Sequence, residues 1–490
     1  MKLNTRMAAQ GCAFAMGISV AHAAVGKAQR SFQSHEVVPG KELLITAPEV
    51  VDSKKSVYPG PWSFGYLMEQ AFKEEEAPGT VARWLEKWAA GDAKAGVPAR
   101  PGVNELIRQW RFKDGHKAGD GLWVPDFSNA PFRLLAIVNR MDLALPMTAL
   151  RDERGNIEQR ISGPTIPYYD GFGGSLFADS TAGEARFVFG VLDADGAVLD
   201  GGSTLILEYG LDGNTSQAEV LNWAMDWHAL GTHEKFDGNY LAALAGVTHR
   251  FTRREAGKQP EGALPRLTRF NSPTQLLRVR TNDGSFGATR EFREFRVSSG
   301  GLAAAPLPGT PKAVFFEKGT RENRWLARWL RKEQTGGNNP STIRGDALKE
   351  RQFNMNFPTS ISLGGKTIQT VAMAAPVPEN NADYHWDAYA MSDRELRRTF
   401  SMQTCCGCHC GDTKTQFFHI TPRPAGKEAV VSAYMKMGGE KATVQDPGSK
   451  RKVTLQEMDE RQLVFESLLN PGLSSTKVRR IREARLARAH

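Results

Sequence analysis

The chain has 490 residues, of which 40% are hydrophobic and 24% are charged, and its formal net charge is +9 at pH 7. This length and composition predict two or three globular domains and exclude a mainly disordered protein. The positive excess is small for the length and no nucleic-acid-binding motif accompanies it, so we expect no nucleic-acid partner.

The first 23 residues have the pattern of a secretory signal peptide. Lys2 and Arg6 precede an apolar run over 7–20, and the small-residue pattern of residues 21–23 follows. This order predicts cleavage after residue 23. The alternatives are an N-terminal membrane anchor and a lipid attachment at Cys12. We expect a periplasmic or secreted protein with no transmembrane span in the mature chain, whose net charge falls to +7 when Lys2 and Arg6 are removed.

Residues 24–61 are polar and rich in proline and glycine, so we expect an extended N-terminal arm. Residues 62–300 begin with apolar residues at helical spacing, and a further helical pair is expected over 221–251. Strand-like runs occupy 132–138, 185–192, 204–209, 275–280 and 291–297. The last two alternate apolar and charged residues, which is typical of edge or half-exposed strands. We therefore expect one α+β domain over 62–300, with helices and an antiparallel sheet.

Residues 301–391 are expected to be a linker and helical connection that includes an amphipathic helix over 321–332. From residue 392 to 490 we expect a small, mainly helical domain with a final helix over 457–469. Its tail carries six basic residues, Lys477, Arg479, Arg480, Arg482, Arg485 and Arg488. Such a tail is either a solvated helix end or a peripheral contact with anionic lipid or an acidic redox partner.

Residues 405–410 read CCGCHC and hold four of the five cysteines of the chain. A secreted protein stabilised by disulfides would spread its cysteines along the chain, so this cluster favours a cofactor or metal site. Cys405, Cys408 and His409 form the pattern C-x-x-C-H. In an exported protein this pattern indicates one c-type haem, held by two thioethers and by the histidine as axial iron ligand.

The segment from residue 392 resembles a cytochrome c domain. The resemblance implies a helical cradle in which Leu396 and Phe400 pack against the final helix. It also implies one-electron transfer to a redox partner protein that the sequence does not identify. The sixth iron ligand would be Met437 or Met435 in the glycine-flanked YMKMGGE loop, or His419. An open sixth position would instead allow an oxidoreductase.

Two cysteines of the cluster exceed what a haem site needs. Cys406 and Cys410 are four residues apart, so they either form a disulfide or stay free. An alternative use of the cluster is a Zn²⁺ or Cu(I) site, in which the four thiols act with His409 or His419 in a non-redox binding protein. A purely structural disulfide clasp is the third interpretation.

The stretch TCCGCHCGDTKTQFFHITPR over 404–423 is also similar to one in a group of uncharacterised exported bacterial proteins with a single CxxCH. The stretches over 132–143 and 183–193 resemble the same group. The resemblance implies that most of the mature chain belongs to one type of protein, and it implies no established activity. Cys406 and Cys410 depart from that group's pattern.

Overall fold

The computed structural model separates residues 1–37 from residues 38–490 as two units, and the description below concerns the second. The expected signal peptide and basic tail lie outside the described residues. No helix within the described residues is both long and apolar enough to cross a membrane. The structure describes residues 36–117, 121, 123–143, 149–151, 157–160, 167–169, 175–177, 181–193, 195–212, 217–254, 274–298, 300–307, 309–334, 357–377, 394–402, 404–439, 441–446 and 450–469.

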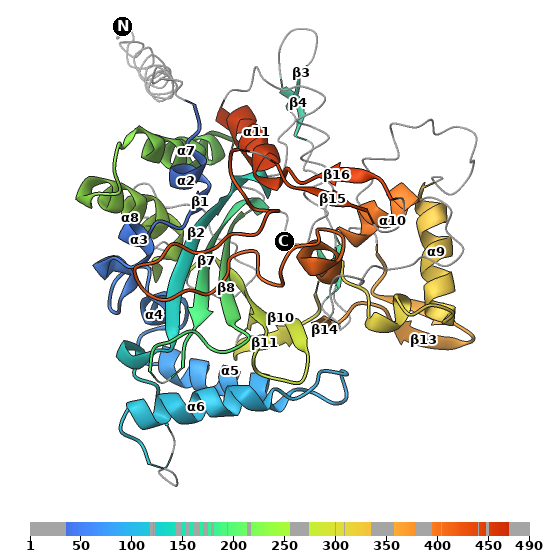
Figure 1. Cartoon of the computed structure of the whole chain (residues 1–490), viewed down its shortest axis with the longest axis horizontal. Helices are drawn as coiled ribbons and strands as arrows, with labels where there is room; N and C mark the ends of the chain where they lie inside the picture. The colour runs from blue at the N-terminus through green and yellow to red at the C-terminus, as the bar shows by residue number, and fades with distance from the viewer. Residues whose placement is uncertain are drawn as a thin grey trace, which may run out of the picture. The chain divides into compact units, whose positions relative to one another are not determined.

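An antiparallel sheet of eight strands forms the centre of this unit (Figure 1). The sheet confirms the expected α+β class. Its strands in spatial order are β1 (Leu44–Ile45), β2 (Phe132–Arg140), β7 (Thr181–Val191), β8 (Ser203–Asp212), β9 (Leu276–Asp283), β10 (Arg290–Ser298) and β11 (Gly301–Ala305), and β14 (Ala374–Val377) also pairs with β10. Three of these strands, β1, β11 and β14, lie outside 62–300, so the sheet draws on more of the chain than expected.

Helices cover the apolar face of the sheet. Aromatic side chains mediate the contact: Trp84 packs on Phe295 of β10, and Phe251 packs on Phe187 of β7 and Tyr209 of β8. Because alternate strand residues point to one face, these apolar positions form a continuous core with the helices. The helices are α4 (Phe64–Phe72), α5 (Ala77–Ala90), α6 (Pro101–Lys113), α7 (Gln217–Ala229) and α8 (Gly238–Thr252).

The expectation that 275–280 and 291–297 are edge or half-exposed strands is wrong. Strands β9 and β10 lie inside the sheet, and Arg278, Arg280 and Glu294 are each at most 7% exposed. Their charged side chains are buried because they pair with charges on neighbouring strands instead of with water. Alternation of apolar and charged residues indicates two different faces, but it does not distinguish a solvated face from a paired one.

Residues 38–56, expected as part of an extended arm, contain α2 (Pro39–Glu42), β1, α3 (Pro48–Val51) and the 3₁₀ turn η1 (Lys54–Ser56). Pro39 and Pro48 each stand at the start of a helix. Proline is tolerated there because the first backbone N–H groups of a helix have no hydrogen-bond partner within the helix. Two of the prolines that suggested an arm therefore begin short helices.

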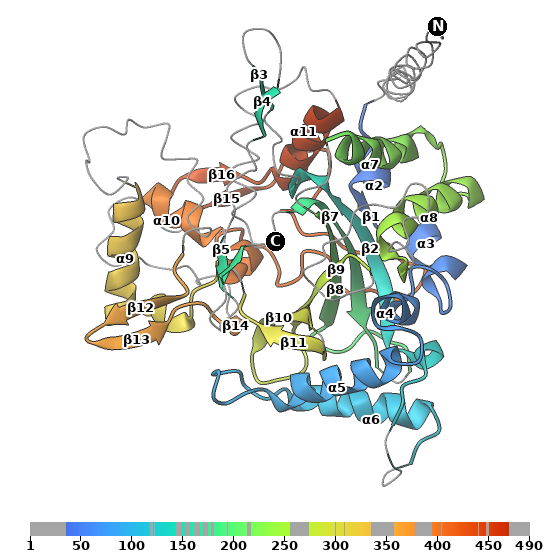
Figure 2. The same ribbon diagram turned by 180° about the vertical axis from the view of Figure 1, so that it is seen from behind.

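The C-terminal helices pack differently from a closed haem cradle. Leu396 and Phe400 of α10 (Arg394–Ser401) lie in an apolar cluster with residues that include Leu326 of α9 (Arg321–Gln334). Helix α11 (Glu457–Leu469) instead contacts α7, where Phe465 faces His228. Figures 1 and 2 show α9 and α10 on the opposite side of the sheet from α7 and α8.

The remaining elements are short. The strand pairs are β3 (Ala149–Arg151) with β4 (Ile157–Arg160), β5 (Pro167–Tyr169) with β6 (Ser175–Phe177), β12 (Ser360–Leu363) with β13 (Lys366–Gln369), and β15 (Thr443–Gln445) with β16 (Lys452–Thr454). Further 3₁₀ turns are η2 (Phe127–Asn129), η3 (Met141–Leu143), η4 (Leu230–Thr232) and η7 (Ala313–Phe315).

Candidate functional site

The cysteine cluster begins with one tight helical turn. The Cys408 N–H donates to the Thr404 carbonyl at 3.0 Å, and the Gly407 N–H donates to Thr404 Oγ1 at 3.1 Å. A Cβ on Gly407 would lie 1.9 Å from the Ser401 carbonyl oxygen, so only glycine fits there. Cys405 and Cys408 are thus about one helical turn apart, with Cys405 against Thr310 and Cys408 against His419.

The turn then breaks at η10 (Gly407–Gly411), where His409 and Cys410 leave helical geometry. Cys410 has φ 75° and ψ −59°, a rare and strained conformation for a residue with a side chain. Strain of this kind costs about 1–3 kcal/mol and is typical of functional sites. The break turns His409 away from the helix axis and into the protein.

His409 has a fixed orientation and a fixed tautomer. Its Nδ1 lies 2.8 Å from the Phe417 carbonyl oxygen, and its ring packs on Phe292 of β10 with centroids 4.7 Å apart. A carbonyl oxygen can only accept, so Nδ1 carries the hydrogen. Burial lowers the pKa of His409 to about 4, so the ring is neutral at pH 7. Nε2 therefore carries the lone pair, which is the form that coordinates a metal.

His419 lies against His409, with ring centroids 4.0 Å apart. His419 Nε2 lies 3.6 Å from Cys408 Sγ, and Nδ1 lies 2.8 Å from Ser432 Oγ. Burial holds the pKa of His419 well below its usual value, and the neighbouring His409 lowers it further. With ring centroids this close and the rings tilted by 39°, the two imidazoles are too near each other to hold one haem between them, so the arrangement does not support His419 as a second iron ligand.

The four thiols point to different neighbours. Cys405 Sγ accepts from Thr310 Oγ1 at 3.3 Å, Cys406 Sγ lies 3.6 Å from the Pro376 carbonyl oxygen, and Cys408 faces His419. Cys410 is a free cysteine, so the disulfide between Cys406 and Cys410 is not formed. Within the described residues, no group of three or more His, Cys, Asp or Glu side chains is placed to hold a metal ion.

Burial keeps two of the thiols protonated. It raises the pKa of Cys405 to about 11, although the bond from Thr310 opposes this, and it raises the pKa of Cys410 to about 12. Cys405, Cys406 and Cys410 belong to one apolar cluster with Phe292, Leu307, Ala375, Val377, Phe417 and Phe418. The cysteine turn therefore lies on β10 and β14 of the central sheet.

The two methionines considered as sixth ligands lie in the loop after His419. Met435 is buried and follows Tyr434, whose ring lies 5.0 Å from that of His419. Met437 is half-buried and lies beside α2, where its Cε would be 4.0 Å from a Cβ placed on Gly40. The structure thus brings Cys405, Cys408, His409 and His419 together and places both methionines farther along the same loop.

A buried ion-pair clamp fixes the segment that follows the motif. Arg397 of α10 donates to Asp412 at 2.5 Å and to Asp446 at 2.8 Å, and Thr413 Oγ1 donates to the Cys408 carbonyl at 2.7 Å. We did not predict this clamp from the sequence, where the acidic residue and threonine after CxxCH were its only signal.

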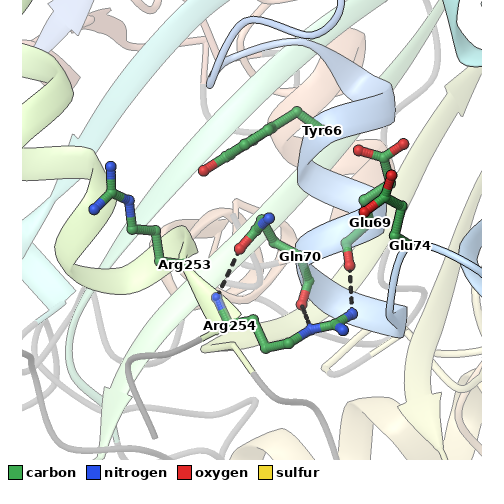
Figure 3. A pocket seen from close by; sticks show the side chains of 6 residues that line it. All are labelled: Tyr66, Glu69, Gln70, Glu74, Arg253 and Arg254. Carbon is green, nitrogen blue, oxygen red and sulfur yellow. Dashed lines mark hydrogen bonds between the residues drawn. The ribbon is translucent and has the colours of Figure 1, made fainter. Parts of the chain in front are cut away.

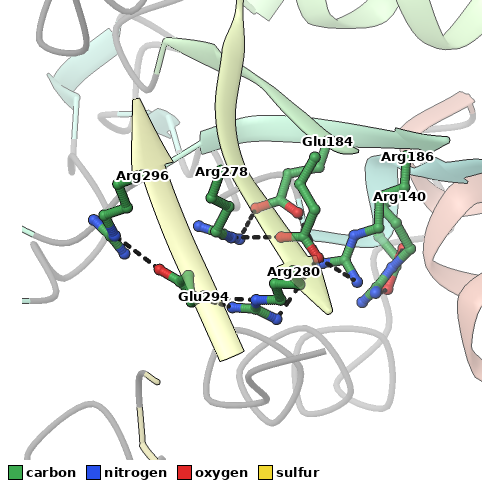
Figure 4. A network of polar contacts seen from close by, with 9 residues as sticks. Arg140, Glu184, Arg186, Arg278, Arg280, Glu294 and Arg296 are labelled. Carbon is green, nitrogen blue, oxygen red and sulfur yellow. Dashed lines mark hydrogen bonds and ion pairs between the residues drawn. The ribbon is translucent and has the colours of Figure 1, made fainter. Parts of the chain in front are cut away.

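Nine charged residues on the polar face of the sheet and in the adjoining turn η3 form a group that we call the sheet network (Figure 4). Arg186 contacts Glu184 at 2.9 Å and Glu208 at 3.3 Å. Arg278 contacts the same two carboxylates, and Arg280 links Glu208 at 3.6 Å to Glu294 at 3.0 Å. Arg296 completes the chain on Glu294, and Arg140 pairs with Asp142 at its other end. Sequence reasoning missed this network.

The sheet network and the cysteine turn are neighbours. The positive charge of Arg280 acts on both Cys405 and His409, whose pKa values it lowers. At the other end, Glu457 of α11 acts on His419 and on Arg140, and it accepts a bond from Tyr434 at 2.9 Å. The stretches over 132–143, 183–193 and 404–423 therefore meet at one buried polar site.

A separate surface pocket of about 340 Å³ lies at α4 and the end of α8 (Figure 3). Burial raises the pKa of Glu69 in this pocket. The Tyr58 hydroxyl donates a hydrogen bond to Glu69, and this bond raises the pKa of Tyr58 to about 12. Arg254 is already bonded to the backbone of Glu69 and to the side chain of Gln70. The lining contains no cysteine or histidine, so the pocket does not share the chemistry of the cysteine turn.

No protein-family model matches this chain, and no curated protein or solved structure shows a significant similarity to it.

Proposed function

We propose that this protein is an exported c-type haem protein, periplasmic or secreted, that transfers single electrons to a redox partner. Cys405 and Cys408 would hold one haem through thioethers, and His409 would be the axial ligand of its iron. When bound, the haem supplies the one-electron chemistry at its iron. The cytochrome-like character of the region from 392 to 490 belongs to this proposal.

The bond from His409 Nδ1 to the Phe417 carbonyl carries the proposal. Ligating histidines almost always donate their other ring N–H to a carbonyl or carboxylate, which fixes the tautomer and raises the basicity of the coordinating nitrogen. His409 has this arrangement, with Nδ1 at 2.8 Å from the Phe417 carbonyl oxygen. Its lowered pKa also means that no proton competes for Nε2 at neutral pH.

The donor set fits a haem in its chemistry. The turn from Thr404 to Cys408 places two thiols one helical turn apart, directly before the axial histidine. The surrounding apolar cluster, which includes Phe292 and Phe417, excludes water from the cysteines. A dry environment raises the cost of adding charge at an iron, so these residues would set the redox potential. Met435 and Met437 remain the proposed sixth ligands.

The test compares single cysteine variants of the full chain, produced in a host that attaches haem to exported proteins. We expect Cys405→Ala and Cys408→Ala each to lose a thioether and the double variant to lose covalent haem entirely. Cys406→Ala and Cys410→Ala are matched controls from the same six residues, and they should keep it. Haem staining of the denatured protein and the intact mass report the result, because thioethers survive denaturation. A wild-type protein without covalent haem would refute the proposal.

The second candidate is a non-redox binding protein that holds Zn²⁺ or Cu(I). The observation in its favour is the pair formed by Cys408 Sγ and His419 Nε2 at 3.6 Å, since thiolate and imidazole are preferred ligands of both ions. Metal analysis of the native protein distinguishes the two candidates. One equivalent of zinc or copper that is lost in Cys406→Ala or Cys410→Ala, without covalent haem, would support this second candidate.

A further inference from the structure

The surface pocket of about 340 Å³ at α4 and the end of α8 has a charged lining. Its volume lies at the lower end of the range for small-ligand sites, roughly 300–1,000 Å³. Figure 3 shows Arg253 on one side of the pocket and Glu69 and Glu74 on the other, with the Tyr66 ring extending between them. The lining is therefore divided into a positive side and a negative side.

The two carboxylates of the negative side repel each other. Burial raises the pKa of Glu69, the hydrogen bond from the Tyr58 hydroxyl opposes this, and the charge of Glu74 raises it further. Neither carboxylate forms an ion pair with any residue that the structure describes. A cation beside Glu69 and Glu74 would reduce this repulsion, and an ammonium group could donate a hydrogen bond to each of them.

The positive side is fixed to the negative side by bonds within the protein. The Arg254 side chain donates to the Glu69 carbonyl at 2.6 Å, and the Arg254 backbone N–H donates to Gln70 Oε1 at 2.9 Å. These bonds join the end of α8 to the last turn of α4. Arg253 lines the pocket from the C-cap of α8. Because both walls are already joined, a ligand would bind at a small entropic cost.

We propose that this pocket binds a small zwitterion, with its ammonium group at Glu69 and Glu74 and its carboxylate at Arg253. The two carboxylates of the lining would repel a simple anion, and its two guanidinium groups would repel a simple cation. A molecule that carries both charges is instead attracted at each end. The Tyr66 ring would contact the methylene groups between the two charges.

Free amino acids are the simplest ligands of this class. Glycine, β-alanine and γ-aminobutyrate carry the same two charged groups, separated by an increasing number of methylene groups. Their relative affinities therefore report the distance between the two sides of the pocket. The proposal does not depend on haem attachment, because the lining contains no residue of the cysteine turn.

The experiment is a calorimetric titration of the mature protein with each of the three amino acids. It is made at low ionic strength, because salt screens exposed charges. Butylamine and butyrate are the reference ligands, since each carries only one of the two charges. We expect the tightest of the amino acids to bind about tenfold more tightly than either reference ligand, because it gains one more charged hydrogen-bonding contact.

Two variants remove one side of the pocket each. Arg253→Gln should weaken binding of this amino acid about tenfold, to the level of butylamine, and Glu74→Gln should weaken it equally, to the level of butyrate. Both residues are exposed, so neither change should affect folding. Glu75→Gln is the matched control, because Glu75 is exposed, adjacent to Glu74 and outside the lining. Its affinity should equal that of the wild type.

Three results would overturn the proposal. The first is that no amino acid of the series binds more tightly than butylamine and butyrate. The second is an unchanged affinity in Arg253→Gln, which would show that the carboxylate of the ligand does not contact this side. The third is an equal loss in Glu74→Gln and Glu75→Gln, which would show a general effect of surface charge and no contact in the pocket.

Discussion

Replacing Gly407 by alanine is the most direct test of the cysteine turn. The new Cβ would lie 1.9 Å from the carbonyl oxygen and 2.4 Å from the carbonyl carbon of Ser401. Both are backbone atoms, so no side-chain rotation relieves the overlap and the turn must open. Opening it would strain or break the bonds from the Cys408 and Gly407 N–H groups to Thr404.

The magnitude follows from these contacts. Overpacking in a buried site costs about 1–3 kcal/mol. Losing two hydrogen bonds adds about 0.5–1.5 kcal/mol each. We therefore expect Gly407→Ala to lower the free energy of unfolding by about 2–6 kcal/mol. Under the proposed haem attachment it should also reduce covalent haem, because opening the turn changes the spacing between Cys405 and Cys408.

The matched control is Gly246→Ala in α8, where an added Cβ meets no atom within 4 Å. Alanine is the better helix former, so this change should stabilise the protein by about 0.5–1 kcal/mol. Urea unfolding followed by tryptophan fluorescence measures both variants against the wild type. Equal unfolding midpoints for Gly407→Ala and the wild type would refute the described geometry of the turn.

Three further predictions concern buried charges and thiols. Arg397→Met removes the cation that pairs with Asp412 and Asp446, so it should destabilise the protein by about 3–5 kcal/mol in urea unfolding. Adding Asp412→Asn to this variant should restore part of the lost stability. A double variant that is less stable than Arg397→Met alone would contradict the clamp. The pKa values of Glu208 and Glu294 lie below normal in the folded protein. Their stabilising effect is therefore present above the unfolded pKa of about 4.3 and is lost as the pH falls below that value. Urea midpoints that stay constant down to pH 3 would contradict this prediction. Burial raises the pKa of Cys405 from 9.0 to about 11. Alkylation of this thiol at pH 8 in the native haem-free protein should therefore be about 100-fold slower than in urea. Mass spectrometry measures the two rates, and equal rates would show that Cys405 is accessible.

Two of the helices were accessible from sequence pattern, and so was the position of the motif. Apolar residues at helical spacing predicted α9 and α11 close to their observed bounds, because an amphipathic helix records its buried face in its own residues. The CxxCH spacing likewise identified Cys405, Cys408 and His409, because it is set by consecutive residues.

The sheet network was not accessible in this way. Glu184, Glu208 and Arg278 come from three strands and meet only when β7, β8 and β9 pair in one register. From the sequence, the alternating charges of β9 and β10 indicated a solvated face, since charged residues are mostly exposed. The structure buries them because ion pairs form across the strands, such as those of Arg278 with Glu184 and Glu208, and the partners in these pairs lie in different segments.

By itself, the sequence determined two local features of this protein: its apolar periodicities and the thiol spacing before His409. Tertiary structure decided what each of these features faces. It placed Thr310 on Cys405, Phe417 on His409 and Leu396 on α9. The physical reason is that burial and charge pairing depend on contacts between residues far apart in the chain. Those contacts form only when the strands pair in the folded protein.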